Sequence, residues 1–184
     1  MINNNDMIDE LFVNFLKEET NQEKHSQIDL GDILNLLEKE NISVKTHNKG
    51  GFVGLSTFWG IYFNLNNLSR FPNAMKYFII LHEIGHMKRI RKRGQDDVLS
   101  SFSESDFDKF AESVINEEII ADRYALFVYR KLSGCFLSKD YTQKLDLPEY
   151  QKRYKSFLKP YHTNLDNSLE SYKKDLKNKF DINV

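Results

Sequence analysis

The sequence predicts an α+β protein in which a small sheet stands between helical segments. Apolar residues recur at helical spacing in residues 1–42, and again from residue 73 onward. The stretch between them is rich in β-branched and aromatic side chains and is broken by glycines, which is typical of short strands. We therefore expect one domain over residues 1–184, with N-terminal helices, a central core (43–134) and a C-terminal helical extension (135–184).

Two helices are predicted in the N-terminal part. Each would gather four apolar side chains on one face, because residues three or four apart in a helix lie on the same side. The first set is Ile8, Leu11, Phe12 and Phe15, and the second is Leu30, Ile33, Leu34 and Leu37. The 14 Phe and 9 Tyr residues indicate an aromatic-rich core, to which we also assign Trp59.

The central part begins with strands. Residues 42–68 read ISVKTHNKGGFVGLSTFWGIYFNLNNL. The glycines divide this stretch into two or three short strands, which we expect to form a small antiparallel sheet. Ile61, Phe63 and Leu65 alternate along the last strand and are expected to share one of its faces.

Longer helices follow the strands. Pro72 suits a first helical turn and Gly94 suits a helix C-terminus, so the first helix is expected from Asn73 to Arg93. The second reads SESDFDKFAESVINEEIIADRYALFVYRKLSG and is expected to end near Gly134. The tail is predicted to form two more helices, and the apolar residues of the last one are Leu165, Leu169, Tyr172 and Leu176.

Composition and charge narrow the classes of function. A formal net charge of −1 gives no electrostatic case for direct nucleic-acid binding. The start MINNNDMIDE lacks the features of a secretory signal peptide, and no apolar run approaches the roughly 20 residues that span a bilayer. With Cys135 as the single cysteine, no intramolecular disulfide can form. We therefore expect a cytoplasmic protein that does not interact with membranes.

The segment FIILHEIGHMKRIRKRG carries the candidate chemistry. His82 and His86 differ by about 40° around a helix, so both can bind one metal ion. Glu83 lies about 100° from His82, where it can act as a general base on a water at the metal rather than as a ligand. A glycine inside a helix costs about 1 kcal/mol relative to Ala, so Gly85 indicates that another backbone approaches closely. The alternative is two ordinary, partly buried histidines, and a third ligand would distinguish the two cases.

The second long helix offers that ligand. Its apolar stripe consists of Phe107, Ala111, Val114, Ala121 and Ala125. Glu118 falls in the middle of the stripe, where an unpaired carboxylate is costly, so we expect a cation beside it. Glu117 points about 100° away and is the weaker candidate. Asp122 is placed to accept the second ring N–H of a ligand histidine. An ion pair between Glu118 and Arg89 is the alternative to metal binding.

These two segments carry a resemblance to a known family. HEIGH at residues 82–86, followed by EEIIADRYA at residues 117–125, resembles the gluzincin arrangement H-E-x-x-H plus E-x-x-A-[DN]. With the glycine-rich segment and strand before the first helix, the chain resembles ImmA/IrrE metallopeptidases over residues 45–130. The resemblance implies a minimal zincin-like fold, in which the sheet packs on the H-E-x-x-H helix and on a glutamate helix.

The resemblance also implies a function. The metal ligands would be His82, His86 and Glu118, and the catalytic base would be Glu83. The cofactor would be Zn²⁺, with Mn²⁺ as the alternative. The implied reaction is site-specific cleavage of a protein, commonly a helix-turn-helix repressor of a mobile element or of stress genes. A second class of function stays open: a non-catalytic, metal-stabilised module that binds a regulator or an antitoxin-like partner.

Other positively charged or hydrogen-bonding groups have weaker assignments. The basic run KRIRKR at residues 88–93 complements the helix dipole, and we expect it to form a solvated face rather than a docking patch. Arg89 is the exception, because it lies one turn beyond His86 and is placed to line a substrate groove. For a second oxyanion donor the candidates are Tyr62, His47 and Arg123, and the sequence does not choose among them.

Overall fold

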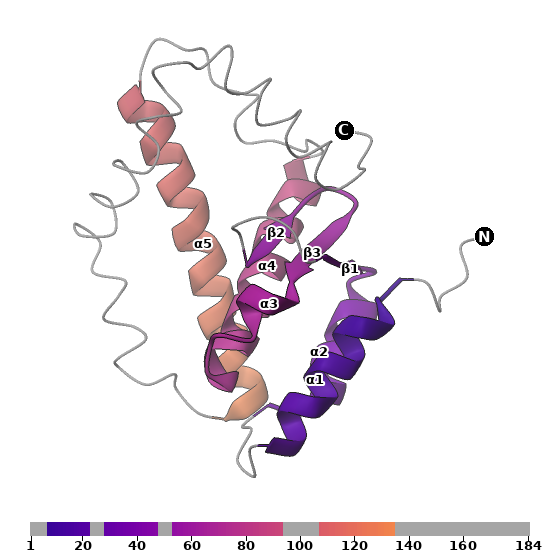
Figure 1. Cartoon of the computed structure of the whole chain (residues 1–184). Coiled ribbons are helices and arrows are strands. Elements are labelled where there is room, and N and C mark those ends of the chain that lie inside the picture. The colour runs from indigo at the N-terminus through magenta and orange to yellow at the C-terminus, as the bar shows by residue number, and fades with distance from the viewer. Residues whose placement is uncertain (1–6, 23–27, 48–52, 94–106, 135–184) are drawn as a thin grey trace. The chain divides into compact units, whose positions relative to one another are not determined.

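The computed structural model describes residues 7–22, 28–47, 53–93 and 107–134. The elements there, in chain order, are α1 (Glu10–Gln22), α2 (Leu30–Lys39), β1 (Ser43–His47), β2 (Gly54–Ser56), β3 (Gly60–Asn64), α3 (Leu65–Leu68), α4 (Asn73–Arg93) and α5 (Phe107–Ser133) (Figure 1). A small sheet among several helices confirms the predicted α+β class.

The chain forms two compact units. The first comprises residues 1–96 and 120–137, and the second comprises residues 97–119 and 138–184. Helix α5 continues through the boundary, and all the other described elements belong to the first unit. The helices predicted beyond residue 134 lie outside the described residues, and a single domain over the whole chain stays a prediction.

The three strands form a mixed sheet in the order β1-β3-β2. Strand β2 pairs antiparallel with β3, as expected, but β1 pairs parallel with β3, so the prediction of a purely antiparallel sheet is wrong. Four of the five residues in β3 are buried, and this strand takes the central place, where both edges are covered. Strand β2 comes between β1 and β3 in the sequence and runs in the opposite direction to both, so β1 and β3 are parallel neighbours in the sheet.

Strand β3 is also shorter than expected. It ends at Asn64, whose side chain caps helix α3 by accepting a hydrogen bond from the backbone N–H of Asn67 at 3.2 Å. Leu65 therefore begins a helix instead of continuing the strand. Ile61 and Phe63 are fully buried, as their alternation predicts.

One face of the sheet carries the core. Phe63 stacks on Phe12 of α1 with ring centroids 5.2 Å apart. Gly54 lies directly opposite Phe63 in the antiparallel pair, so it is on the same face, and there it lies against Glu83 of α4. Leu55, paired with Tyr62, is on the other face. Helices α1 and α4 therefore pack on the same side of the sheet.

Helix α1 is fastened to the sheet through Asp9. Its Oδ1 accepts the backbone N–H of Leu11 at 2.9 Å, which satisfies a donor at the start of the helix. Its Oδ2 accepts the backbone N–H of Thr46 at 3.0 Å and the Thr46 hydroxyl at 2.5 Å. One carboxylate thus joins the start of α1 to strand β1.

Two apolar side chains that the sequence assigns to buried positions are exposed. Leu11 is 62% exposed, because the buried side of α1 is formed by Phe12 and Leu16, and Leu11 is one residue away from Phe12 around the helix. Trp59 is 61% exposed. It lies in the turn between β2 and β3, where the Thr57 hydroxyl accepts its backbone N–H at 3.2 Å.

Both ends of α4 and the C-terminal end of α5 lie where the sequence predicts them. Helix α4 runs from Asn73 to Arg93, as the sequence predicts. Helix α5 ends at Ser133, and Gly134 follows with φ of +69°, a conformation that favours glycine. The Gly134 N–H donates to the Arg130 carbonyl at 3.0 Å and so satisfies one carbonyl of the last turn.

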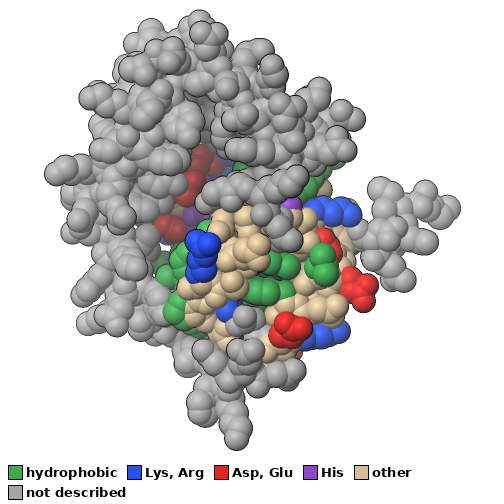
Figure 2. All heavy atoms as spheres, in the orientation of Figure 1, with side chains coloured by type: hydrophobic (Ala, Val, Ile, Leu, Met, Phe, Trp, Pro, Cys, Tyr) green, Lys and Arg blue, Asp and Glu red, His purple; other side chains and the backbone are tan. Residues whose placement is uncertain are grey.

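The basic run at the end of α4 is partly used inside the fold. Arg91 donates to the carbonyls of Glu40 and Asn41 at 2.7 and 2.9 Å, and the Lys88 ammonium lies 2.6 Å from the Glu40 carboxylate. The two Arg91 contacts satisfy carbonyls at the C-terminal end of α2. On the face in Figure 2, basic and acidic side chains of the described residues are interspersed rather than separated by sign.

Candidate metal centre

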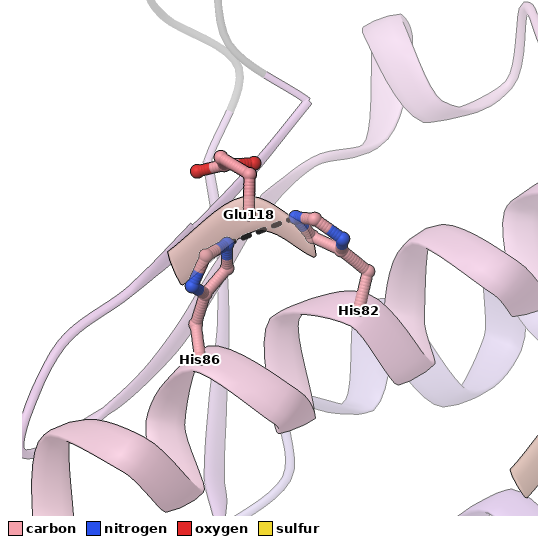
Figure 3. Close-up of side chains that lie close together, drawn as sticks. All are labelled: His82, His86 and Glu118. Atoms are coloured by element: carbon pink, nitrogen blue, oxygen red, sulfur yellow. Dashed lines mark hydrogen bonds between the residues drawn. The ribbon is translucent and has the colours of Figure 1, made fainter. Parts of the chain in front are cut away.

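The two histidines of the H-E-x-x-H segment face each other from successive turns of α4. Their Nε2 atoms are 2.9 Å apart, and their rings are nearly perpendicular, with an interplanar angle of 83° and centroids 4.5 Å apart (Figure 3). Both side chains are half-buried. The spacing of four residues therefore brings the two ring nitrogens to one point, as the helical geometry predicts.

Asp122 determines which nitrogen of His82 carries a proton. Its Oδ1 lies 2.7 Å from Nδ1 of His82, and the two side chains are only 9% and 16% exposed. A carboxylate accepts hydrogen bonds, so we assign the proton of neutral His82 to Nδ1. The Nε2 atom then carries a lone pair and points towards His86. This contact is the one that the helical position of Asp122 leads one to expect.

The lone pair on Nε2 of His82 limits what can lie next to it in the close contact with His86. An imidazole nitrogen with a lone pair attracts either a donor N–H or a cation at its front. His86 can supply the donor N–H if its proton is on Nε2. If both Nε2 atoms present lone pairs, a cation bound by both nitrogens removes the repulsion.

Glu118 completes a group of three donors. One carboxylate oxygen of Glu118 and one nitrogen each of His82 and His86 all lie within 4.8 Å of one another. Figure 3 shows the carboxylate, carried by α5, near the two imidazoles of α4. With Zn–N distances of about 2.0 Å, two ligand nitrogens on a tetrahedral ion are about 3.3 Å apart, so small side-chain movements would bring this group to zinc geometry.

The donor types also suit zinc. Two imidazoles and one carboxylate are a set that zinc enzymes use, with a fourth position left for water or substrate. Among the described residues, these three are the group whose donor atoms converge in this way. The three residues could therefore hold one metal ion.

The neighbouring glutamate differs from its expected burial. Glu117 is only 7% exposed, whereas Glu118 is half-buried, so the expectation that Glu118 occupies the more buried position of α5 is wrong. Position 117 turns inward, while position 118 opens towards the histidines, which are themselves half-buried. The predicted stripe itself is correctly placed where it is described, because Ala121 and Ala125 are fully buried on the same side of α5 as Glu118. The side chains of Phe107, Ala111 and Val114 lie outside the described part.

Gly85 provides the clearance that its position in the helix indicates. A Cβ atom at residue 85 would lie 3.1 Å from Cα and 3.2 Å from the carbonyl oxygen of Ala121. It would also lie 3.2 Å from Cδ1 of Tyr124. Helix α4 therefore packs against the backbone of α5 at this point, and this close packing brings Asp122 within reach of His82.

The Glu83 side chain is held away from solvent by strand β2. It is 8% exposed, and the Ser56 hydroxyl lies 2.7 Å from its Oε2 atom and 2.7 Å from its carbonyl oxygen. The sequence reasoning missed Ser56 altogether. The one available signal was Gly54, because a glycine inside a strand often marks the close approach of another group.

The remaining candidates are distributed over several elements. Arg89 is half-buried in α4, one turn beyond His86. The side chains of Tyr62 and Ser56 lie on opposite faces of the sheet. Burial raises the pKa of the Tyr62 phenol. Arg123 is exposed on α5, and His47 ends β1. Tyr62 is therefore on the other side of the sheet from Glu83 of α4. The positions of Tyr62, His47 and Arg123 do not choose a second oxyanion donor among them.

Comparisons with protein-family models, with curated proteins and with solved structures gave no match to this chain. Its resemblance to the ImmA/IrrE family therefore depends on the residues quoted above. No helix in the described part of the chain combines the length and the apolar character needed to cross a membrane.

Proposed function

We propose that this chain is a zinc-dependent metalloendopeptidase of the ImmA/IrrE type. Its substrate would be a specific regulatory protein, such as a helix-turn-helix repressor of a mobile element or of a stress response. One observation carries the proposal: His82, oriented by Asp122, directs Nε2 at the matching nitrogen of His86, and the Glu118 carboxylate lies close to both. Two histidines and a glutamate are one of the donor sets found in catalytic zinc sites, which supports the proposal.

Each residue then has a role in peptide hydrolysis. His82, His86 and Glu118 would hold the ion. When bound, zinc supplies a lowered pKa for a coordinated water, near 7, and polarises a substrate carbonyl. Glu83 takes the proton from the attacking water and later delivers it to the leaving amine. Asp122 keeps the His82 proton on Nδ1, so that Nε2 stays a ligand.

The alternative function is a metal-stabilised module that binds a regulator without cutting it. The presence of Glu83 favours the enzyme, because a site that only stabilises the fold does not need a carboxylate base beside its ligands. The donor set favours it as well. Structural zinc sites are commonly closed by four protein ligands, whereas the converging group found among the described residues consists of three.

The test uses the Glu83→Gln variant, which preserves side-chain size and removes the base. Wild type and variant are loaded with zinc and incubated with a peptide library made from a bacterial lysate, and new N-termini are identified by mass spectrometry. We expect wild type to cut at a restricted set of sites, and the variant to lose at least about 100-fold in rate with equal zinc content. Equal cleavage by both proteins contradicts the role of Glu83. Zinc binding without any cleavage by wild type favours the binding module.

A further inference from the structure

We infer that strand β2 positions the side chain of Glu83, with Ser56 as the positioning residue and Gly54 as the clearance it needs. The inference depends on the proposed function, because it matters for catalysis only if Glu83 is the base. It assigns a role to two residues of a three-residue strand that lies outside the H-E-x-x-H and E-x-x-A-[DN] motifs.

The Ser56 hydroxyl lies within hydrogen-bond distance of two oxygen atoms of Glu83 and can donate its single proton to either one. It lies 2.7 Å from the carbonyl oxygen of Glu83 and 2.7 Å from Oε2 of the same residue. A hydroxyl has one proton and two lone pairs, so it can donate to a carboxylate or accept from a carboxylic acid. The same contact can therefore persist when the base carries the proton that it transfers. The carbonyl contact also ties the helix turn that bears Glu83 to the strand.

Gly54 makes room for this arrangement. A Cβ atom at residue 54 would lie 2.7 Å from Cγ, 2.8 Å from Oε1 and 2.9 Å from Cδ of Glu83. Real side chains do not approach so closely, so any other residue at this position forces the glutamate to move. Glycine is unfavourable in strands, and this contact gives a physical reason for its presence here.

The position of the buried Glu83 carboxylate matters for the rate of the proposed reaction. The Glu83 side chain is nearly enclosed, and glutamate has three rotatable side-chain bonds that must all be fixed for the carboxylate to stay in one place. A small misplacement of a catalytic group can cost about 100-fold in rate. Ser56 and Gly54 act on the same carboxylate from one strand, one through a hydrogen bond and the other through the absence of a side chain.

The test compares Ser56→Ala, Ser56→Thr and Gly54→Ala with a matched control, Leu55→Ala. Leu55 lies in the same strand but points to the other face of the sheet, so its variant reports on any general weakening of β2. Crystal structures of the zinc-loaded proteins give the Glu83 conformation directly. We expect Ser56→Thr and Leu55→Ala to keep Glu83 in place, and Ser56→Ala and Gly54→Ala to move its carboxylate or spread it over several conformers.

Kinetics on a peptide cut by wild type give the second readout. We expect Ser56→Ala to lower kcat about 10- to 100-fold with KM and zinc content unchanged, and Ser56→Thr to restore most of the rate. An unmoved Glu83 in both Ser56→Ala and Gly54→Ala overturns the inference, whatever the activity. If wild type cuts no peptide, the proposed function fails, and the crystal structures still decide whether β2 positions Glu83.

Discussion

Nδ1 of His82 lies 2.7 Å from Oδ1 of Asp122, and this contact joins α4 to α5 at the candidate metal centre. We predict that Asp122→Ala lowers zinc affinity about 10- to 100-fold, because His82 loses the partner that orients its ring and fixes its tautomer. Competition with a chromophoric chelator measures the affinity. Arg123→Ala, an exposed change one residue along the same helix, is the control and should leave zinc affinity unchanged. Equal affinities in all three proteins would remove Asp122 from the centre.

Whether Gly85→Ala raises or lowers the free energy of unfolding tests how closely α4 packs on α5. An exposed glycine inside a helix is usually improved by alanine, by up to about 1 kcal/mol. Here a Cβ atom would lie 3.1 Å from Cα of Ala121, so the two helix backbones must separate. We predict that Gly85→Ala destabilises the protein by about 1–3 kcal/mol, measured by urea unfolding. A stabilised Gly85→Ala protein would show that α4 and α5 do not pack as closely as described.

Leu11 and Phe12 are neighbours with opposite environments. Phe12 is fully buried and stacks on Phe63, whereas Leu11 is 62% exposed. Removing the Phe12 ring leaves a cavity, so Phe12→Ala should lower the free energy of unfolding by about 3–5 kcal/mol. Leu11→Ala is the matched control and should change it by less than about 0.5 kcal/mol. Similar losses from both variants would mean that α1 presents a different face to the sheet.

The Asp9 carboxylate predicts a dependence of stability on pH. Burial alone raises the pKa of Asp9, but hydrogen bonds from the Thr46 hydroxyl and from the backbone N–H groups of Leu11 and Thr46 outweigh it, and the pKa is lowered overall. The folded pKa is then below the unfolded value of about 3.9. The stabilisation is therefore present above pH 3.9 and is lost as the pH falls through the folded pKa.

We expect Asp9→Asn to cost about 0.5–1 kcal/mol at pH 7, a figure reduced for the solvent exposure of this pair. The difference from wild type should shrink as the pH falls below 3.9. Urea unfolding between pH 7 and pH 3 measures it. Glu38→Gln, which removes an exposed carboxylate on α2, controls for the loss of one negative charge. A difference that is constant over this range would contradict the assignment to the charged form.

How much of this fold follows from the sequence depends on the range of the interactions involved. Helix α4 was predicted from Asn73 to Arg93 because its start depends on local signals such as Pro72. The parallel pairing of β1 with β3 was not predicted, since alternation within a strand does not say which strand is its neighbour. The exposure of Leu11 was missed for a related reason: helical spacing defines a face but not the centre of its contact.

The candidate site divides in the same way. The convergence of His82 and His86 follows from helix geometry, and the contact with Asp122 follows from a periodic pattern on a second helix. The contact between Ser56 and Glu83 joins residues 27 positions apart on a strand and a helix, so no local pattern contains it. Gly54 was visible in the sequence, but a glycine in a strand signals close approach without naming the group that approaches.

The central claim is that His82, His86 and Glu118 hold one zinc ion. The most direct measurement is the zinc content of wild type, His82→Ala, Glu118→Ala and Glu83→Gln after dialysis against zinc and then against metal-free buffer. We predict one zinc per chain in wild type and in Glu83→Gln, little or none in His82→Ala, and a strongly reduced content in Glu118→Ala. Wild type without zinc, or full occupancy in His82→Ala or in Glu118→Ala, would contradict the claim.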